Sequence, residues 1–486
     1  MIGCRPFRDL LRERALADGA RPAVVSREGL LSYGEVAVRA AAAAEKLVEA
    51  GIGPGTQVAL VLSNSVEYVV WFFGILEVGG VVVPLPPSIA PVEKEALCKE
   101  GGIGWIVSPP GSLLQKTRSA PRSVASDPDA CDDLVACQFS SGSTGFPRAI
   151  LRTGSNFLAD AAHYAATLGI GPDDRFLGVA PFHHAFGGLS FLAAFPVGAS
   201  VITVPRFLPG PVLESARRHR PTVFLATPLM ISVLATCALA PGEEGAFRTV
   251  RHCVCSGGPL GKVAHDAFVE RFGVPVRVQY GSTETLATTI DLDDGFEEGR
   301  VGRPFEGVTV HAFDDGGSPL PPGAPGRVGI RSEAACKGYA NDPIGTAERF
   351  HGGYVFPGDR GVVDARGVLH LLGRSDVINI GGLKVDPVEV ADVIRAAFPV
   401  SAVEVFASER SGVPAVFAAV EADPARVTPA LVVAACRARL SPHKVPARVE
   451  VVTLLPRNES GKVVRETLGA VGPGGTDETG GQDRTS

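Results

Sequence analysis

The sequence predicts an α/β protein: a large N-terminal domain of mainly parallel sheets flanked by helices, with a β subdomain, and then a small α+β C-terminal domain. Three observations lead to this fold class. Strand-like and helix-like segments alternate through the first part of the chain, which is typical of parallel sheets covered on both faces. Short strands with many Gly/Pro turns occupy residues 301–372. About one hundred residues of hairpin, helix and strand pattern follow Arg374.

The first elements carry clear start and stop signals. Ser32 and Glu35 have the spacing of a capping box, so an alanine-rich helix should begin here and end at Gly51. The elements expected next are a strand over 58–62, a helix over 65–78 and a strand over 81–83. The Gly-rich run 51–55 follows a helix rather than a strand, and it therefore predicts a turn and not a dinucleotide site.

Glycine and hydroxyl residues gather where the later strands should end. The strands expected here span residues 134–139, 223–226, 249–255 and 276–279, and a helix opens at Pro228. Ser-Gly-Gly-Pro follows the third of these strands, and Tyr-Gly-Ser-Thr-Glu follows the fourth. Because ligands of open α/β sheets bind outside the carboxyl ends of the strands, we expect the functional site at this edge.

Composition narrows the class of protein. The 486 residues carry a net charge of −6, which gives no electrostatic footprint for nucleic acid, so no nucleic-acid partner is expected. Nine cysteines without a C-x-x-C pair indicate a reducing, cytoplasmic location, and Cys253 and Cys255 read as packed thiols. The N-terminus lacks a secretory apolar core. The apolar stretch 68–85 contains Glu, Gly and Pro, which favours a buried helix and strand over a membrane span.

The strongest local signal is the segment 139–148, FSSGSTGFPR, at the end of an expected strand. Small residues let backbone amides approach a polyphosphate, hydroxyls donate further hydrogen bonds, and Arg148 supplies positive charge. The Walker pattern is not matched. Taken alone, this segment has a flexible Ser/Gly turn as its less favoured interpretation.

Together with other motifs, this segment resembles the acyl-adenylate-forming superfamily, which contains acyl- and aryl-CoA ligases, firefly luciferase and the adenylation domains of peptide synthetases. Six further motifs occur in the order of that family: VAPFHHAFGG, VCSGGPL, VQYGSTET, YVFPGDRG, LGRSDVINIGGLKV and PRNESGKVVRETL. The resemblance covers about residues 5–468. It implies AMP-dependent ligase chemistry with ATP and Mg²⁺, and a C-terminal domain that is mobile.

The resemblance implies a set of ATP-binding residues. The phosphate loop matches Ser140, Ser141, Gly142, Ser143, Thr144 and Gly145. Arg148 stands where the family usually has lysine and Ala149 where it usually has glycine, which leaves the contact of Arg148 open because a guanidinium is a fork rather than a point charge. The other nucleotide positions are Tyr280 on adenine, Gly281, Thr283 at the α-phosphate, Asp359 on the ribose, and Arg374.

The same resemblance implies the catalytic groups. Glu284 matches the magnesium ligand, and a carboxylate oxygen suits this hard cation. Lys462 matches the lysine that offsets charge during adenylation. Outside their motifs, Glu284 would be a helix cap, Asp359 a turn residue and Lys462 a solvated surface lysine.

The acid-binding pocket is implied by two motifs. His184 matches the residue beside the acyl carboxylate, and Phe186, Gly257 and Gly258 match pocket walls. Without the resemblance, the pair His183 and His184 would be one packed and one surface histidine. Residues 179–188 contain no carboxylate to pair with an ammonium, which predicts an apolar or aromatic acid and not an α-amino acid.

These features predict domains over residues 1–374 and 377–468, a disordered tail over 472–486, and a hinge at Asp376, with Ser375 as the competing choice. The expected reaction activates an aryl or short-to-medium acyl carboxylic acid as acyl-AMP and passes the acyl group to CoA. A separate carrier protein with its phosphopantetheine, or an amine, is the alternative acceptor. A degenerate homologue that only binds nucleotide or acyl ligand is the alternative of another class. The oligomeric state stays open, with a homodimer among the options.

Overall fold

The computed structural model describes residues 7–89, 91–109, 113–119, 133–140, 148–374, 378–380, 383–385, 387–410, 413–440, 442–458, 463–464 and 468. By its internal contacts the chain divides into two compact units, residues 1–374 and 375–486. The predicted tail over 472–486 lies outside the described residues.

The larger sheet of the first unit combines a parallel part with an antiparallel part. Its strands, in sheet order, are β18 (Phe350–His351), β19 (Tyr354–Val355), β17 (Pro325–Arg331), β20 (Asp359–Val363), β21 (Leu369–Arg374), β15 (Arg300–Pro304), β14 (Leu286–Ile290), β13 (Val276–Ser282), β12 (His252–Cys255), β11 (Val223–Ala226), β9 (Arg175–Gly178), β10 (Ser200–Thr203), β1 (Pro22–Val25) and β2 (Leu30–Ser32), with β16 (Thr309–Phe313) paired to β17. The strands from β13 to β1 run parallel, and those beyond β13 run antiparallel. The predicted β subdomain therefore continues the hydrogen-bonded path of the parallel strands.

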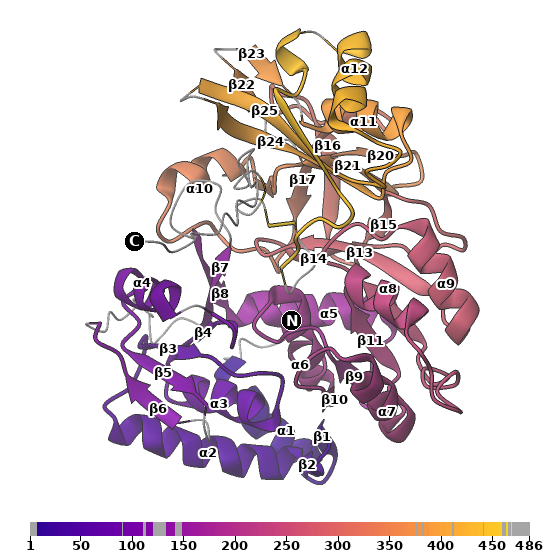
Figure 1. Cartoon of the computed structure of the whole chain (residues 1–486). Helices are drawn as coiled ribbons and strands as arrows, with labels where there is room; N and C mark the ends of the chain where they lie inside the picture. Colours follow the sequence, from indigo (N-terminus) through magenta and orange to yellow (C-terminus); the bar gives the residue numbers. More distant parts are fainter. Residues whose placement is uncertain are drawn as a thin grey trace, which may run out of the picture. The chain divides into compact units, whose positions relative to one another are not determined.

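A smaller sheet and the helices complete the first unit. The smaller sheet has the order β6 (Leu113–Lys116), β5 (Trp105–Ser108), β3 (Gln57–Leu60), β4 (Val81–Pro84), β7 (Leu134–Ser140) and β8 (Arg148–Thr153). The helices are α1 (Leu10–Asp18), α2 (Tyr33–Glu49), α3 (Val66–Glu77), α4 (Pro91–Gly101), α5 (Gly154–Leu168), α6 (Ala185–Leu192), α7 (Pro209–His219), α8 (Pro228–Thr236), α9 (Lys262–Phe272) and α10 (Pro343–Arg349). Their labels can be followed in Figure 1.

Alternate residues of the central parallel strands enter two different hydrophobic cores. Phe176 of β9 and Val223 of β11 pack with side chains from α1, α2, α3, α5 and α6. Leu177 and Phe224, their neighbours in sequence, pack with side chains from α7, α8 and α9. Because successive side chains of a strand point to opposite faces, helices cover both faces of these strands. Val58 of β3 belongs to the first core as well, so that core lies between the two sheets.

Several predicted elements are confirmed with small shifts of boundary. The capping box is present, since the amide of Ser32 donates to Glu35 Oε2 at 2.8 Å and the amide of Glu35 donates to Ser32 Oγ at 3.3 Å. The apolar stretch 68–85 forms most of α3 and the strand β4, both buried, as expected. Cys253 and Cys255 are buried free thiols in the second core.

One strand differs from its prediction in a way that matters for the site. The fourth strand was expected over residues 276–279, but β13 continues to Ser282. Gly281 and Ser282 pair with Ala287 and Leu286 of β14, so the Tyr-Gly-Ser segment belongs to a β-hairpin and not to a loop. The local reason is the tight turn over 283–285 that reverses the chain.

The second unit is a small α+β body. Its elements are β22 (Ile378–Ile380), β23 (Leu383–Val385), α11 (Pro387–Ala397), β24 (Ala402–Arg410), β25 (Val413–Glu421), α12 (Pro429–Arg439) and β26 (Arg448–Val452). β24 and β25 pair antiparallel, β25 and β26 pair parallel, and β22 pairs with β23. Val390 and Ile394 of α11 pack with Val432 and Cys436 of α12 in its core.

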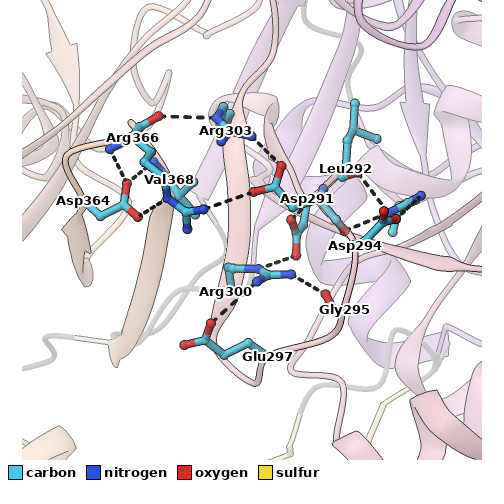
Figure 2. A network of polar contacts seen from close by, with 12 residues as sticks. Asp291, Leu292, Asp294, Gly295, Glu297, Arg300, Arg303, Asp364, Arg366 and Val368 are labelled. Carbon is cyan, nitrogen blue, oxygen red and sulfur yellow. Dashed lines mark hydrogen bonds and ion pairs between the residues drawn. The ribbon is translucent and has the colours of Figure 1, made fainter.

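The connection from β14 to β15 in the first unit is tied by charged side chains (Figure 2). Asp291 directly follows β14, and its Oδ2 accepts from Nε of Arg300 at 2.7 Å. Arg300 also donates to the carbonyl of Gly295 and lies 3.7 Å from the carboxylate of Glu297. These contacts join Arg300, at the start of β15, to residues throughout the preceding loop, and so they hold the loop in one conformation.

Candidate functional site

The hairpin of β13 and β14 carries the Tyr-Gly-Ser-Thr-Glu motif, and its geometry requires glycine at one position. A Cβ atom on Gly281 would lie 2.1 Å from the carbonyl oxygen of Leu286, which no side chain tolerates. Leu286 itself has a φ of +57°, which is uncommon for a residue with a branched side chain. The tight turn between them places Thr283 and Glu284, both half-buried, at the tip of the hairpin.

Two fully buried ionisable side chains hold the hairpin through its backbone. Arg152 of β8 donates to the carbonyl of Ala334 at 2.8 Å and to the carbonyl of Thr283. Asp160 of α5 accepts from the amide of Ala287 at 3.1 Å. Burial raises the pKa of Asp160 to about 7, while the hydrogen bond from Ala287 and the nearby charge of Arg152 oppose that rise. The motif backbone is thereby fixed on both sides of Glu284.

Glu284 is also held through its own atoms. Its Oε1 accepts from the hydroxyl of Tyr339 at 2.8 Å, and its carbonyl accepts from the amide of Cys336 at 2.9 Å. Burial, and then the charge of Glu284, raise the pKa of Tyr339 well above its ordinary value, so the phenol keeps its proton and remains the donor. The orientation of the carboxylate is thus set before any ligand arrives.

The ends of the predicted phosphate loop lie close to this hairpin. Ser140 ends β7, Arg148 begins β8, and the two residues pair in the antiparallel register. Arg148 Nε donates to Asp342 Oδ2 at 2.8 Å, and its guanidinium lies 4.9 Å from the ring centre of Tyr339. The next amide, of Ala149, donates to Asn341 Oδ1 at 2.8 Å. Arg148 is therefore joined to Glu284 through the ring of Tyr339.

The predicted nucleoside contacts also lie together. The hydroxyl of Tyr280 donates to Asp359 Oδ2 at 2.7 Å. Asp359 begins β20 and pairs with Arg374, the last residue of β21. Tyr280 is thus brought to the same place in the sheet as Asp359 and Arg374, although the side chain of Arg374 is not among the described ones.

The predicted acid-binding residues follow β9 and β12, whose carboxyl ends share one edge with β11. His184 precedes the first residue of α6, and its imidazole centre lies 4.3 Å from that of His183. Burial, aided by the charge of His184, lowers the pKa of His183 to about 3, which keeps that ring neutral at physiological pH. Gly257, with a φ of +96°, and the exposed Gly258 follow β12.

The entry into α6 is unusually tight. A Cβ atom on Gly187 would lie 2.0 Å from the carbonyl oxygen of Pro181, so the chain can turn here only at glycine. Phe186, directly before it, is half-buried and packs against both hydrophobic cores of the sheet. The segment after β9 is thereby fixed at the strand-end edge where the sequence predicted the site.

Several predicted residues lie outside the described part of the chain. These are the phosphate-loop residues Ser141, Gly142, Ser143, Thr144 and Gly145, the catalytic lysine Lys462, and both hinge choices, Ser375 and Asp376. Their roles stay predictions.

Sequence reasoning missed four residues of this region: Arg152, Asp160, Tyr339 and Asp342. The signal for two of them was present. Arg152 shares one face of its strand with the buried Ile150, and Asp160 lies in an alanine-rich helix, so each is a charge at a core-facing position. A charged side chain is rarely buried without a partner, so a charged residue at a core-facing position predicts that a hydrogen-bond or ion-pair partner lies nearby.

The donor set fits a magnesium ion that is bound mainly by substrate. Among the residues that the structure describes, no group of three or more His, Cys, Asp or Glu side chains is arranged to hold a metal. Glu284 offers one carboxylate at the hairpin tip, beside the hydroxyl-bearing Thr283. Mg²⁺ usually takes one or two carboxylates and completes its shell with water and substrate phosphates, so a single glutamate is sufficient.

Comparison with known proteins identifies the family of this chain. Residues 11–340 match the AMP-binding enzyme family. The chain is 29% identical to 3-hydroxybenzoate–CoA ligase of Aromatoleum sp. (strain CIB), with 94% of each chain covered. It is also 29% identical to feruloyl-CoA synthase of Amycolatopsis sp., over 90% of this chain and 92% of that protein. The crystal structure of ATP-bound MatB from Rhodopseudomonas palustris matches 95% of this chain and 98% of its own, with 25% identity and a TM-score of 0.79.

These likenesses place the chain among ATP-dependent ligases with an α/β core. The chain belongs to the AMP-binding enzyme family, and the predicted resemblance to the acyl-adenylate-forming superfamily is confirmed. It is an AMP-forming acid–thiol ligase. No helix in the described part of the chain is long and apolar enough to cross a membrane.

Proposed function

We propose that this ligase activates an aryl or short-to-medium-chain carboxylic acid as acyl-AMP and then transfers the acyl group to CoA. The observation that carries the proposal is that Thr283 and Glu284 lie on the hairpin of β13 and β14, and that Tyr280 of the same hairpin bonds to Asp359 of β20. This arrangement supports a nucleotide held at the same edge where His184 and Phe186 follow β9.

In the first step, a carboxylate oxygen of the acid attacks the α-phosphorus of ATP, and the bond from that phosphorus to the bridging oxygen breaks to release pyrophosphate. Tyr280 and Asp359 would hold the nucleoside, and Thr283 would donate to the α-phosphate. Mg²⁺, bound through Glu284, would offset the negative charge of the phosphates. Lys462 would supply a cation where charge builds up in the transition state.

In the second step, the thiol sulfur of CoA attacks the acyl carbon, the bond from that carbon to the AMP oxygen breaks, and the thiol proton is released. We propose that residues 377–468 move about Asp376 between the two steps, so that one site serves both. Proline fixes φ, so Asp376→Pro should slow thioester formation and spare adenylation. Wild-type rates in both half-reactions would place the hinge elsewhere.

The neutral character of the acid pocket favours an aryl or acyl substrate. Residues 179–188 contain no Asp or Glu, and the buried His183 is uncharged at physiological pH, so an ammonium group would lack a partner there. Two of the most similar proteins are named for 3-hydroxybenzoate and for ferulate, which are aromatic acids. The part-buried ring of Phe186 would offer such an acid a flat wall.

The direct test is ATP–pyrophosphate exchange with benzoates, cinnamates, C4–C10 fatty acids and the proteinogenic amino acids. We expect exchange with aromatic or medium-chain acids and a CoA thioester in the complete reaction. Exchange confined to amino acids would show that the pocket is misassigned. An acyl-AMP that reacts with a pantetheinylated carrier protein and not with CoA would favour the carrier-protein alternative, and an absence of exchange with every acid would favour a degenerate binding protein.

Lys462 separates the two half-reactions. Loss of a group that stabilises developing charge typically lowers the rate by ~10²–10³, so Lys462→Ala should lose adenylate formation by that factor. Conversion of supplied acyl-AMP to thioester should be much less affected. If both half-reactions fall equally, Lys462 does not have the assigned role.

A cytoplasmic location is also part of the proposal, and it rests on the cysteine pattern.

A further inference from the structure

We propose that Tyr339 is a positioning residue for the Glu284 carboxylate, and that Arg148 and Asp342 hold Tyr339 in place. The inference rests on the proposed function, because it takes Glu284 as the carboxylate that binds the metal of a metal–nucleotide complex. It adds three residues from two further segments, β8 and the stretch before α10, to the machinery of the site.

The ring of Tyr339 is fixed by its surroundings. The residue is 6% exposed and packs with Ile150 and Cys336 in a small core. The ring of Phe350 meets it edge-on, with centres 5.3 Å apart and planes at 88°. Its amide donates to Thr346 Oγ1 at 2.9 Å. A phenol held in this way can direct its hydroxyl at one point only.

That point is one oxygen of Glu284. The hydroxyl of Tyr339 donates to Oε1 at 2.8 Å. Among the residues that the structure describes, no hydrogen bond or ion pair engages Oε2, which leaves that oxygen for a cation. A carboxylate with one oxygen bonded to a fixed donor cannot rotate freely about its χ angles, so the second oxygen keeps its direction. Partners of this kind behind a metal ligand typically change metal affinity 10–100-fold when they are removed.

Arg148 completes the arrangement in a way that lysine could not. Its planar guanidinium bonds to Asp342 at 2.8 Å and at the same time lies over the ring of Tyr339 at 4.9 Å. Asp342 is fixed in turn, because its Oδ1 accepts from the amide of Gly345 at the start of α10. An ammonium is a point charge without a planar face, so it could not present a fork to the carboxylate and a flat face to the ring together. The arginine at this position thus acts on the site through Tyr339.

The cleanest test is Tyr339→Phe, which removes the hydroxyl and keeps the ring for Arg148 and Phe350. The matched control is Tyr33→Phe: Tyr33 is fully buried and donates to the carbonyl of Ala199 at 2.5 Å in the core beside α2. Glu284→Gln serves as the reference for loss of the carboxylate. The readouts are the affinity of the full-length enzyme for Mn²⁺·ATP and for AMP without metal, both by calorimetry, together with the apparent activation constant for Mg²⁺ and the Tm.

We expect Tyr339→Phe to weaken Mn²⁺·ATP binding and to raise the Mg²⁺ activation constant by about 10-fold or more, with AMP affinity unchanged. Tyr33→Phe should leave all three values at the wild-type level. An equal loss of AMP and Mn²⁺·ATP affinity in Tyr339→Phe would mean that the hydroxyl only maintains the local structure, and the inference would be overturned.

The variant Glu284→Gln separates a wrong role for Tyr339 from a wrong assignment of Glu284 as the metal ligand. If Glu284→Gln weakens Mn²⁺·ATP binding and Tyr339→Phe does not, Glu284 remains the metal ligand and Tyr339 has no positioning role. If neither variant changes Mn²⁺·ATP binding, Glu284 is not the metal ligand, and both the assignment and the inference fail.

The contribution of Arg148 is tested with two conservative variants. Asp342→Asn keeps a side-chain acceptor for the start of α10 and removes the charge that holds Arg148. Arg148→Lys keeps the charge and removes the planar fork. Both should weaken Mn²⁺·ATP binding in the direction of Tyr339→Phe, by a smaller factor. If Arg148→Lys weakens binding and Asp342→Asn does not, Arg148 acts on the nucleotide directly, and its place behind Tyr339 is wrong.

Discussion

The two ends of β14 are anchored by different kinds of polar contact. Before the strand, at the hairpin tip, the fully buried Arg152 donates to the carbonyls of Thr283 and Ala334, and the fully buried Asp160 accepts from the amide of Ala287. After the strand, charged side chains bond to one another (Figure 2). The pair Asp291–Arg300 next to the strand is largely buried, whereas the pair Arg303–Asp293 beyond it is more exposed. Arg303 Nη1 donates to Asp293 Oδ1 at 2.7 Å, with 46% and 29% of the two side chains exposed.

Exposed and buried polar contacts differ in how much their loss should cost in stability. An exposed ion pair is screened by water and salt and contributes about 0–1 kcal/mol, so it can be lost with little consequence. A buried charge whose partner is removed keeps its desolvation penalty, so the buried network tolerates few changes. The end of β14 held by buried side chains is the one next to Thr283 and Glu284, which suits the positions proposed for them in the site.

Removal of Arg152 is the strongest way to test this contrast. Arg152→Met keeps a long side chain but leaves the carbonyls of Thr283 and Ala334 unpaired and Asp160 without a nearby cation. We expect the free energy of unfolding in urea to fall by about 3–5 kcal/mol. The double variant Arg152→Met/Asp160→Asn should recover part of this loss, because no buried charge is left alone. Additive losses would show that the two side chains act independently.

Asp160 gives the buried network a signature in the pH dependence of stability. Its pKa is raised from an ordinary value near 4 to about 7 in the folded protein, so the fold favours the protonated carboxyl. That contribution is complete below about pH 4 and is lost as the pH rises to about 7. We therefore expect Asp160→Asn to flatten the fall in unfolding free energy over this window, measured by urea titrations at several pH values. An unchanged slope would mean that Asp160 is ionised in the fold.

Features that depend on residues close together in the sequence could be predicted, and features that depend on distant residues could not. The capping box of Ser32 and Glu35 was readable because both partners lie within one helical turn. The edge of the sheet that carries the candidate site was expected from the sequence because glycine and hydroxyl residues follow several strands.

The partners of Arg152 could not be predicted in this way, since Thr283 lies 131 residues further along the chain and only the packing of β8 against the hairpin brings the two together. The length of β13 was misjudged for a related reason. Glycine, serine and threonine suggest a loop, but pairing with β14 overrides that preference. Tyr339 carried no signal of its own, because its role arises from where its hydroxyl points.

Removal of the exposed ion pair between Arg303 and Asp293 should lower the unfolding free energy only weakly, and the size of this effect should depend on salt. Arg303→Met removes the ion pair with Asp293, and the hydrogen bond from Arg303 is the main cause of the lowered pKa of that carboxyl. Because Arg366 also lies within 3.9 Å of Asp293, the carboxylate keeps a cationic neighbour in the variant. We expect the unfolding free energy to fall only slightly at low ionic strength, and by less still in 1 M salt, where the Debye length is about 3 Å. Activity and metal–nucleotide affinity should stay at wild-type values, since the changed contact lies at the end of β14 remote from Glu284. If Arg303→Met lowered the unfolding free energy as much as Arg152→Met does, and salt did not change this loss, solvent exposure would not explain the difference between the two ends of the strand.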